Sequence, residues 1–592
     1  KEKEAINLLY FIVKIIDSNY IQAYTLLLGK GDTDDDNEII CQRLIELGTK
    51  NSYVYIQYGF YLIQGNFKKA MKMIQTGLIK ILLQDQWKLI VERCEERDII
   101  NEYGLHHEKS YDIIRDVFTK EEMVNVIISV FLMSPKIYSN KKEITEHRKG
   151  LKSRIEYLFK HIPKNTYKTI DQLYTSIPNT YVFPLSYYGL NNSKLFKSIS
   201  KLFLHLCPDL NYISENIDVL HNDKKKRIGF ISENIDSNHS VAKDRLGIIR
   251  LLSRTKFTVF GFMFNNPSEK LGNIMYTSFD KCIILNKKSL TDIRKTIEGL
   301  NLDILVYCDI GMSPKTYYLA HSRLAKIQLT TWGHSDTSGI ENIDYYVSSK
   351  YYETDKSQNY YSEKLIKLDS LCTFYYNPLI TYGYKECHQL SRNALGLSNK
   401  YNIYFCPHSL FKLHPGFDTI IKNILKKDKN GLVLFIRKSS AVEAIMDRFN
   451  KTMTSNQLMR IRFLEKKNVH YYYHYIVNSD VILDTHPFGG CNTSLESFAL
   501  KKPVVTLPSK TINGRFTYGF YNKIGVTDLI AKNNKDYVNI AVKLTTDKEY
   551  CKKIVDKITE KSNLLFNEQK SVFDWENMLE SLIDNDNNVW IS

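Results

Sequence analysis

The residues best placed to do chemistry follow a strand-like apolar run that ends near position 484. A pair of glycines separates this run from a stretch with helical spacing, which we expect to begin at Asn492 or Thr493. Glycines let the backbone approach a ligand closely, and the free amides and positive dipole end of a helix suit a phosphate. The pattern therefore predicts an anion site that includes Gly489, Gly490, Cys491, Asn492 and Thr493.

The same segment also has a purely structural interpretation. Thr493-Ser494-Leu495-Glu496 matches a capping box, in which the last side chain returns to the first amide of the helix. In that case Glu496 would only support the helix. The two interpretations make different predictions about where the Glu496 carboxylate points.

Two other groups of potential metal ligands do not indicate a metal site. The acidic run Asp32–Asp36 contains a DxD, which in some sugar transferases holds a metal-bound diphosphate. It lies between helical segments, far from any strand edge, so we expect a solvated loop. The ten cysteines are scattered singly with no CxxC pair, which predicts neither a zinc site nor a disulfide framework.

The glycine pair lies in the second of two regions where strands alternate with helices. The first region starts near residue 224, and a linker rich in Tyr, Asn and Pro at Thr373–Tyr384 precedes the second. Alternation of this kind predicts an α/β fold with two Rossmann-like halves facing a cleft, which bind ligands at the carboxyl ends of their strands. The expected strands are Arg227–Ser232, Phe257–Phe264, Cys282–Leu285, Leu302–Cys308, Ile327–Trp332 and Tyr345–Ser348, then Ile403–Cys406, Gly431–Ile436, Val469–Tyr473, Val481–Asp484 and Pro503–Leu507.

Up to about residue 220 the apolar spacing is helical instead. The segment Tyr61–Ala70 matches the turn of a tetratricopeptide (TPR) unit, although a generic helical hairpin fits as well. The predicted organisation is a helical, TPR-like domain (1–220), an N-terminal Rossmann-like lobe (221–385), a C-terminal Rossmann-like lobe (386–545) and C-terminal helices that pack back on the lobes (546–592).

Composition narrows the class of protein. The chain has 592 residues, 81 Lys plus Arg against 65 Asp plus Glu, a net charge of +16, and 43% hydrophobic residues. This is ordinary globular composition, and no apolar run approaches the ~18 residues of a membrane helix. No secretory leader pattern opens the chain, which begins at Lys1, so we expect that an N-terminal piece has been removed.

Motif content excludes several functions. Neither half has GxGxxG after its first strand, and GxxxxGK[ST] is absent, which disfavours a dinucleotide redox enzyme and a P-loop nucleotidase. The basic residues are spread along the chain without interleaved aromatics, so the charge suits an anionic small substrate better than nucleic acid.

In several segments the chain resembles glycosyltransferase family 41, the O-GlcNAc transferases with their plant SPINDLY-type and bacterial N-glycosyltransferase relatives. The resemblance covers about residues 180–590, with the segments in the same order. They are Phe183–Asn192, Lys226–Ser232, Asn238–Ser240, Ile327–Gly339, Ile343–Tyr346, Tyr361–Leu365, Phe411–Leu413, Val481–Leu500, Lys502–Pro508, Ile540–Leu544, Tyr550 and Lys552–Ile554.

The resemblance implies a GT-B fold and an inverting, metal-independent transfer of one sugar from a nucleotide diphosphate to a protein side chain. No resident cofactor is implied, because the nucleotide sugar is a co-substrate. The resemblance also implies that the lobe at 386–545 binds the nucleotide sugar and that the helical domain at 1–220 presents the acceptor. Lys412 matches the family's catalytic lysine, against the alternative of a solvated surface lysine. His239 matches an acceptor-side histidine that could act as general base, against the alternative of a polar residue at a loop-to-helix junction, where Asp236-Ser237-Asn238 offers N-cap residues. His334 and Ser409 join the predicted nucleotide-sugar-binding residues.

Departures from the family pattern leave the donor open. Cys491-Asn492-Thr493 replaces His-Thr-Thr, Glu496 replaces the Asp that binds ribose hydroxyls, and the uridine-holding Lys and His are replaced within Val469–His474. We expect a cytoplasmic or nucleocytoplasmic enzyme that moves GlcNAc from UDP-GlcNAc to Ser or Thr of proteins, without nucleic acid or membrane partners and with a homodimer left open. Alternatives are UDP-glucose or GDP-fucose as donor, Asn as acceptor, or a decayed helical-repeat scaffold.

Overall fold

The computed structural model describes Leu44 and residues 120–584, apart from 220, 222, 236–238, 267–273, 382, 385–388 and 438. The predicted TPR turn at 61–70 and the acidic run at 32–36 lie outside these residues. The chain divides into two compact units, and the larger holds residues 128–134, 141–436 and 452–592. The smaller unit includes α18 (Ser439–Asn450), whose Arg448 donates from Nη1 to the Tyr138 carbonyl at 3.1 Å.

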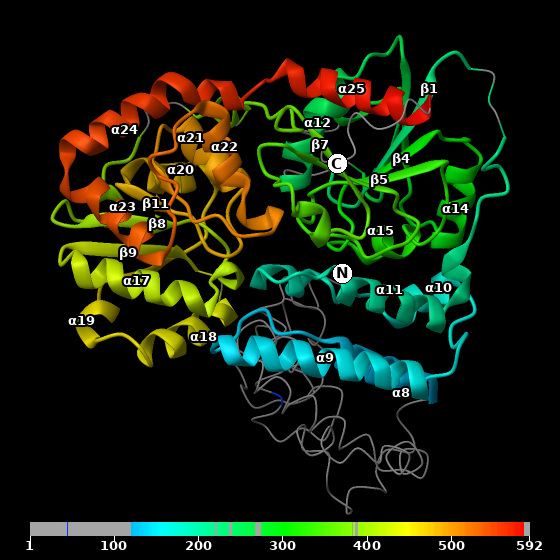
Figure 1. The fold of residues 1–592 in the computed structure, drawn as a ribbon, viewed down its shortest axis with the longest axis horizontal. Helices are drawn as coiled ribbons and strands as arrows, with labels where there is room; N and C mark the ends of the chain where they lie inside the picture. Colours follow the sequence, from blue (N-terminus) through cyan, green and yellow to red (C-terminus); the bar gives the residue numbers. More distant parts are fainter. Residues whose placement is uncertain are drawn as a thin grey trace, which may run out of the picture. The chain divides into compact units, whose positions relative to one another are not determined.

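Helices precede the first sheet. Helix α9 carries Leu151, Ile155 and Leu158 at helical spacing, and this apolar stripe is buried. Helix α11, with seven buried residues, packs against α9. In sequence, α10 and the 3₁₀ helix η2 lie between α9 and α11, which are labelled in Figure 1. The elements are α8 (Lys120–Leu132), α9 (Lys141–His161), α10 (Ile170–Ser176), η2 (Phe183–Tyr188), α11 (Ser193–Leu206) and η3 (Pro208–Asn211).

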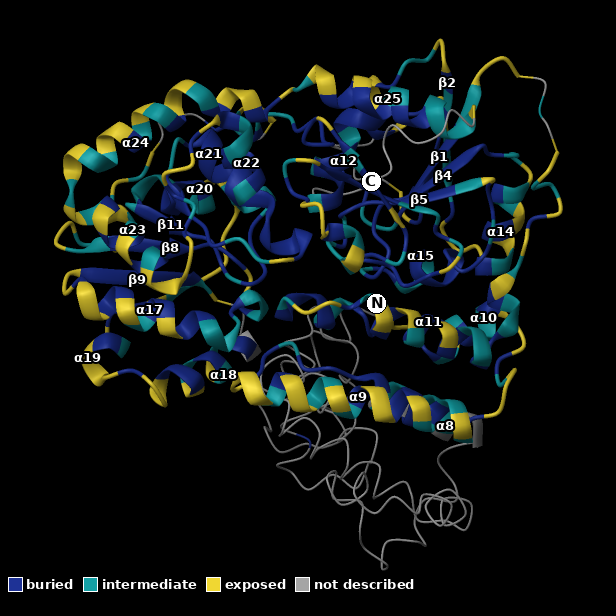
Figure 2. Cartoon of the chain, in the orientation of Figure 1, coloured by how far each residue is buried: buried dark blue, intermediate teal, exposed yellow. Residues whose placement is uncertain are grey.

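The first sheet has seven parallel strands in the order β3-β2-β1-β4-β5-β6-β7. The central strands read as apolar runs and are buried on both faces, as parallel sheets require (Figure 2). The chain order reverses between β1 and β4. The elements are β1 (Lys226–Ser232), α12 (Ser240–Leu251), β2 (Phe257–Met263), β3 (Lys281–Ile284), α14 (Leu290–Glu298), β4 (Ile304–Tyr307), α15 (Pro314–Leu319), β5 (Ile327–Thr330), β6 (Tyr345–Ser349), η4 (Ser357–Tyr360), β7 (Lys364–Leu368) and α16 (Pro378–Thr381).

The second sheet has five parallel strands in the order β10-β9-β8-β11-β12, and here the chain order reverses between β8 and β11. Ligands of open α/β sheets bind at such reversals, outside the carboxyl ends of the strands. The elements are η6 (Asn393–Leu395), β8 (Asn402–Cys406), η7 (Leu410–Lys412), α17 (Pro415–Lys427), β9 (Gly431–Ile436), α19 (Ser455–Leu458), β10 (Ile461–Leu464), α20 (Val469–Asn478), β11 (Val481–Leu483), α21 (Asn492–Ala499) and β12 (Val504–Val505).

One predicted strand is wrong. Val469–Tyr473 belongs to helix α20, and the strand at this place is β10, five residues earlier. The Val and Tyr residues favour a strand by composition. The helix forms because the Asn468 side chain accepts the amides of His470 and Tyr471, and because Tyr473 and Ile476 share a buried face.

The chain ends in helices. Helix α25 contacts α12 and β7 of the first sheet, whereas the helices before it follow the second sheet (Figure 1). Within the described residues, no helix is long and apolar enough to cross a membrane. These elements are η8 (Ile512–Gly514), α22 (Phe516–Ile524), α23 (Asn534–Thr546), α24 (Lys548–Lys561), η9 (Ser562–Leu565) and α25 (Gln569–Ile583).

Candidate active site

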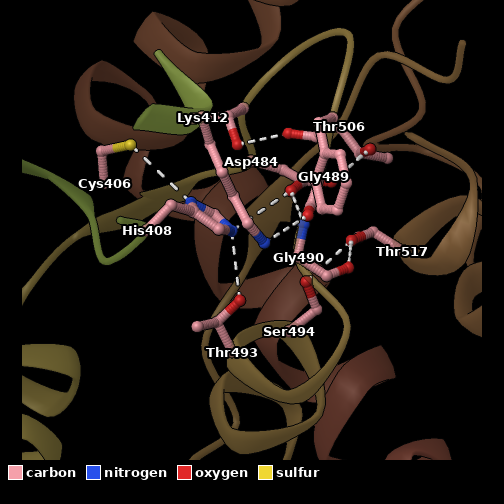
Figure 3. Close-up of polar contacts among 12 residues, drawn as sticks. Cys406, His408, Lys412, Asp484, Gly489, Gly490, Thr493, Ser494, Thr506 and Thr517 are labelled. Carbon is pink, nitrogen blue, oxygen red and sulfur yellow. Dashed lines mark hydrogen bonds and ion pairs between the residues drawn. The ribbon is translucent and has the colours of Figure 1, made fainter. Parts of the chain in front are cut away.

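The glycine pair forms a tight turn between β11 and α21. The Gly490 amide donates to the Asp484 carboxylate at 2.7 Å, and the Thr506 hydroxyl donates to the other oxygen at 2.7 Å. Only glycine fits at 490, because a Cβ would lie 2.3 Å from Thr493 Oγ1 and 2.5 Å from His408 Nε2. Helix α21 then begins at Asn492, as expected from the sequence. The turn therefore holds the start of α21 close to the end of β11 (Figure 3).

Lys412 reaches this turn from the neighbouring strand. It lies in η7, six residues after the end of β8, and its Nζ donates to the Gly489 carbonyl at 3.0 Å. Nζ also lies 4.5 Å from the ring centroid of Phe488. Burial lowers the pKa of Lys412 to about 8, while the Asp484 carboxylate opposes that shift. The lysine is thus a cation at neutral pH, positioned against the glycine pair (Figure 3) and not on the outer surface.

Two buried residues that the sequence analysis missed connect these parts. His408 Nε2 lies 3.1 Å from Thr493 Oγ1 and 3.4 Å from Asp484 Oδ1. Burial and the Lys412 charge lower the pKa of His408 well below its usual range, so the ring is neutral. Burial raises the pKa of Asp484. Both residues lie at or just after the ends of strands that the sequence predicts, but only the structure shows that β8 and β11 are neighbours whose carboxyl ends meet where the chain order reverses.

The other residues predicted at the helix tip lie in different environments. Cys491 is the N-cap of α21 without a side-chain cap, and burial raises the pKa of its thiol well above the usual range. Asn492 Oδ1 accepts the Tyr375 hydroxyl at 2.6 Å. Ser409 is exposed at the start of η7, where its carbonyl accepts the Lys412 amide. The structure therefore brings the helix-tip residues to Lys412 but leaves the Ser409 side chain at the surface.

Glu496 does not close a capping box. Helix α21 starts before Thr493, so Glu496 lies in its second turn and turns away from the first amide. Its Oε1 instead accepts Lys243 Nζ at 2.8 Å, and the Glu496 side chain is 6% exposed. Lys243 belongs to α12, so this ion pair joins the two sheets at the candidate site.

His239 caps α12, the helix that carries Lys243. Its Nδ1 accepts the Val241 amide at 3.4 Å, so His239 itself is the N-cap, and its role as a general base stays a prediction. Burial, and then the nearby Lys243 charge, lower the pKa of His239. His239 therefore lies one turn of α12 before Lys243, the residue that pairs with Glu496.

His334 lies in the first sheet's Gly333–Gly339 loop and is enclosed. Its Nε2 lies 3.0 Å from Ser186 Oγ, and its ring stacks on Phe183 with centroids 5.7 Å apart. Burial lowers the pKa of His334 to about 4. The ring is therefore neutral and packed against η2, and a contact with the donor sugar stays a prediction.

Two parallel open sheets, each with a reversal of chain order, form a GT-B fold, the two-lobed architecture of one class of glycosyltransferases. The sequence model of Glycosyl transferase family 41 matches residues 384–574. The matched segment contains Lys412 and the glycine pair, so the chain is similar to this family at the candidate site.

Curated relatives and a solved structure are also similar to the chain. The chain is 26% identical over 232 residues to the probable UDP-N-acetylglucosamine–peptide N-acetylglucosaminyltransferase SPINDLY of Eustoma exaltatum subsp. russellianum, a match that covers 38% of this chain and 24% of the relative. It is 26% identical over 235 residues to the corresponding probable enzyme SEC of Arabidopsis thaliana, covering 38% of this chain and 23% of the relative. The chain thus spans about a quarter of these relatives.

The fold as a whole is similar to a lysine-to-methionine variant of the Thermobaculum terrenum O-GlcNAc transferase. The TM-score is 0.64 at 17% identity, with 97% of this chain and 100% of the other covered. At this identity the likeness shows the fold alone.

Proposed function

We propose that this chain is a protein glycosyltransferase that transfers a single sugar, GlcNAc by preference, from a uridine diphosphate carrier to Ser or Thr side chains. The match to the family model supports the class of reaction, and so do the names of the relatives, which describe transfer of a sugar to a peptide. The observation that carries the proposal is the position of Lys412, whose Nζ lies 3.0 Å from Gly489 O beside the N-terminus of α21. The proposal includes a cytoplasmic location.

The site suits the departure of a diphosphate. As the bond to the anomeric carbon breaks, negative charge grows on the leaving oxygen, and preorganised cations and amides stabilise it in a water-poor site. Lys412 supplies the cation, and the first amides of α21 supply donors with the positive end of the helix dipole. Thr493 Oγ1 adds a hydroxyl held in place by His408. These groups neutralise charge without a divalent ion, so we expect turnover to persist in EDTA.

The first test measures nucleotide release from a panel of nucleotide sugars, with Lys412→Ala as the diagnostic variant. Loss of one preorganised contact typically lowers the rate by about 10²–10³-fold, and we expect a loss of this order at an unchanged melting temperature. Lys426→Ala is the matched control, because Lys426 is an exposed lysine at the far end of α17. Full turnover by Lys412→Ala would contradict the proposal.

Two further measurements on the same protein identify the donor and the acceptor. Thermal shift with UDP-GlcNAc, UDP-glucose and GDP-fucose ranks the donors, and mass spectrometry of a co-expressed protein locates the sugar on Ser, Thr or Asn. We expect UDP-GlcNAc to give the largest shift. Absence of a shift with every nucleotide would favour a helical scaffold whose transferase lobes no longer bind a donor.

A further inference from the structure

An aromatic side chain from outside both sheets supports the turn that bears Lys412. The ring of Tyr187, in η2, lies with its centroid 4.7 Å from that of Phe411 and 4.4 Å from that of Phe488. Phe411 immediately precedes Lys412, and Phe488 immediately precedes Gly489. Tyr187 therefore contacts the residue before the cation and the residue before the carbonyl that the cation binds.

The η2 segment is fixed from both sides. The Ser186 carbonyl accepts Asn513 Nδ2 at 2.9 Å, and the Ser186 hydroxyl lies 3.0 Å from His334 Nε2. Gly189 ends the turn with φ +65°, and a Cβ there would lie 2.5 Å from Pro487 Cβ. Pro487 follows β11 and Asn513 lies in η8 after β12, whereas His334 follows β5. The η2 segment is therefore held between loops of the second sheet and a loop of the first.

We propose that Tyr187 is a positioning residue for Lys412: by packing on Phe411 and Phe488 together, it fixes the ammonium over the glycine pair. This inference rests on the proposed function, in which Lys412 faces the leaving diphosphate. In this proposal Tyr187 acts on Lys412 through Phe411 and Phe488 and does not touch the substrate.

The Tyr187 ring affects both the hydration and the position of the Lys412 ammonium. Tyr187 is 6% exposed and Phe488 is 8% exposed, and Nζ of Lys412 lies over the Phe488 ring. A smaller side chain at 187 leaves a void that frees both phenylalanines and admits water to the ammonium. A displacement of about 1 Å in a reacting group costs about 10²-fold in rate. Lys412 would then be both misplaced and better solvated.

The charged and titratable groups around Lys412 come from three elements. Asp484 follows β11, and its carboxylate favours the charged lysine. Cys491 caps α21 and Cys406 ends β8, and burial raises the pKa of both thiols, so they are neutral. His408 follows β8 and is held neutral by burial and by the lysine charge. None of them changes in a Tyr187 variant, so a rise in the pKa of Lys412 in that variant reports the loss of burial.

The experiment compares Tyr187→Ala with Tyr187→Phe and with Tyr317→Ala as the matched control. Tyr317 is fully buried, in α15, and its ring packs on Phe203 and Tyr318 rather than near Lys412. We expect Tyr187→Ala to lower kcat by about 10–100-fold while the donor KM changes less than about threefold. Tyr187→Phe keeps the ring contacts and should stay within about twofold of wild type.

A second readout needs no turnover. Reductive ¹³C-methylation and NMR titration report the pKa of Lys412, whose signal is assigned by its absence in Lys412→Arg. We expect this pKa to rise in Tyr187→Ala and to stay at its wild-type value in Tyr317→Ala. If the pKa and kcat of Tyr187→Ala match those of Tyr317→Ala, the positioning role is wrong. If Lys412→Ala keeps full turnover, the proposed function fails, and the inference falls with it whatever Tyr187 does.

Discussion

At the scale of single residues, the candidate site depends on how one buried cation is balanced. Lys412 has a carboxylate, Asp484, among its surroundings, yet desolvation prevails and its pKa falls to about 8. The Asp484 oxygens are already occupied by the Gly490 amide and the Thr506 hydroxyl. The ammonium therefore keeps its direct bond to the Gly489 carbonyl, an acceptor that an anionic ligand can replace.

The lowered pKa of Lys412 predicts a pH limit on turnover. A lysine that must be charged supports catalysis below its pKa and fails above it, so we expect kcat to fall as the pH rises through about 8. A solvated lysine would hold its charge to about pH 10. The measurement is kcat at saturating donor from pH 6 to 10. Lys412→Arg stays charged throughout, so its residual activity should lack this limb. A wild-type profile that is flat to pH 10 would contradict the assignment.

The same residues show how much of the site can be predicted from the sequence. Gly489, Gly490 and the start of α21 were predictable because a glycine pair before a helical pattern is a local signal. Lys412 was found through resemblance, and its contact with Gly489 spans 77 residues. His408 and Asp484 carry no motif. Their meeting depends on β8 and β11 being neighbours, which strand alternation alone does not specify.

At the scale of elements, the ion pair between α12 and α21 shows what local patterns miss. Thr493–Glu496 has the letters of a capping box, but the N-cap of α21 is Cys491, two residues before Thr493, and Glu496 pairs with Lys243, 253 residues away in sequence. Helix α20 gives the same lesson, because its valines and tyrosines favour a strand while the Asn468 cap and a buried face select a helix. For Glu496 a tertiary contact overrides the local pattern, and for α20 a local side-chain cap and a buried face together override the strand propensities.

The Lys243–Glu496 pair predicts a coupled effect on donor affinity. Lys243→Met and Glu496→Gln should each raise the donor KM by about tenfold, since a charge-assisted hydrogen bond is worth about 1.5–3 kcal/mol. The double variant should cost no more than either single one, because both remove the same link.

The control for this cycle is Lys523→Met, which breaks a comparably buried ion pair with Glu568 away from the glycine turn. We expect it to leave the donor KM within about twofold of wild type. Additive losses in the Lys243 and Glu496 double variant would show that the two residues act independently. Steady-state kinetics with a varied donor supply the measurement.

At the scale of the whole larger unit, helix α25 packs on the first sheet although it follows the second sheet in sequence. The two parallel sheets were predictable from the alternation of strands and helices, and the structure confirms this fold. The return of α25 to the first sheet brings its Trp575 to strand-end residues about 200 positions earlier, where Nε1 donates to the Cys372 carbonyl at 3.1 Å. The guanidinium carbon of Arg245 in α12 lies 5.9 Å from the Trp575 ring. The last helix thus completes the core of the first sheet.

Trp575→Ala should therefore weaken the sheet that is distant in sequence rather than the one that precedes it. Removing a buried Trp costs about 3–5 kcal/mol, and Trp575 is 0% exposed. We expect faster hydrogen exchange in β7 and α12, which contact α25, with β8 and β9 unchanged. Phe573→Ala is the control, since Phe573 on the same helix is 59% exposed and its loss should cost about 0.5 kcal/mol or less. Equal exchange in the two variants would mean that α25 only covers the sheet; the expected difference would mean that the first sheet cannot reach full stability until the end of the chain has folded onto it.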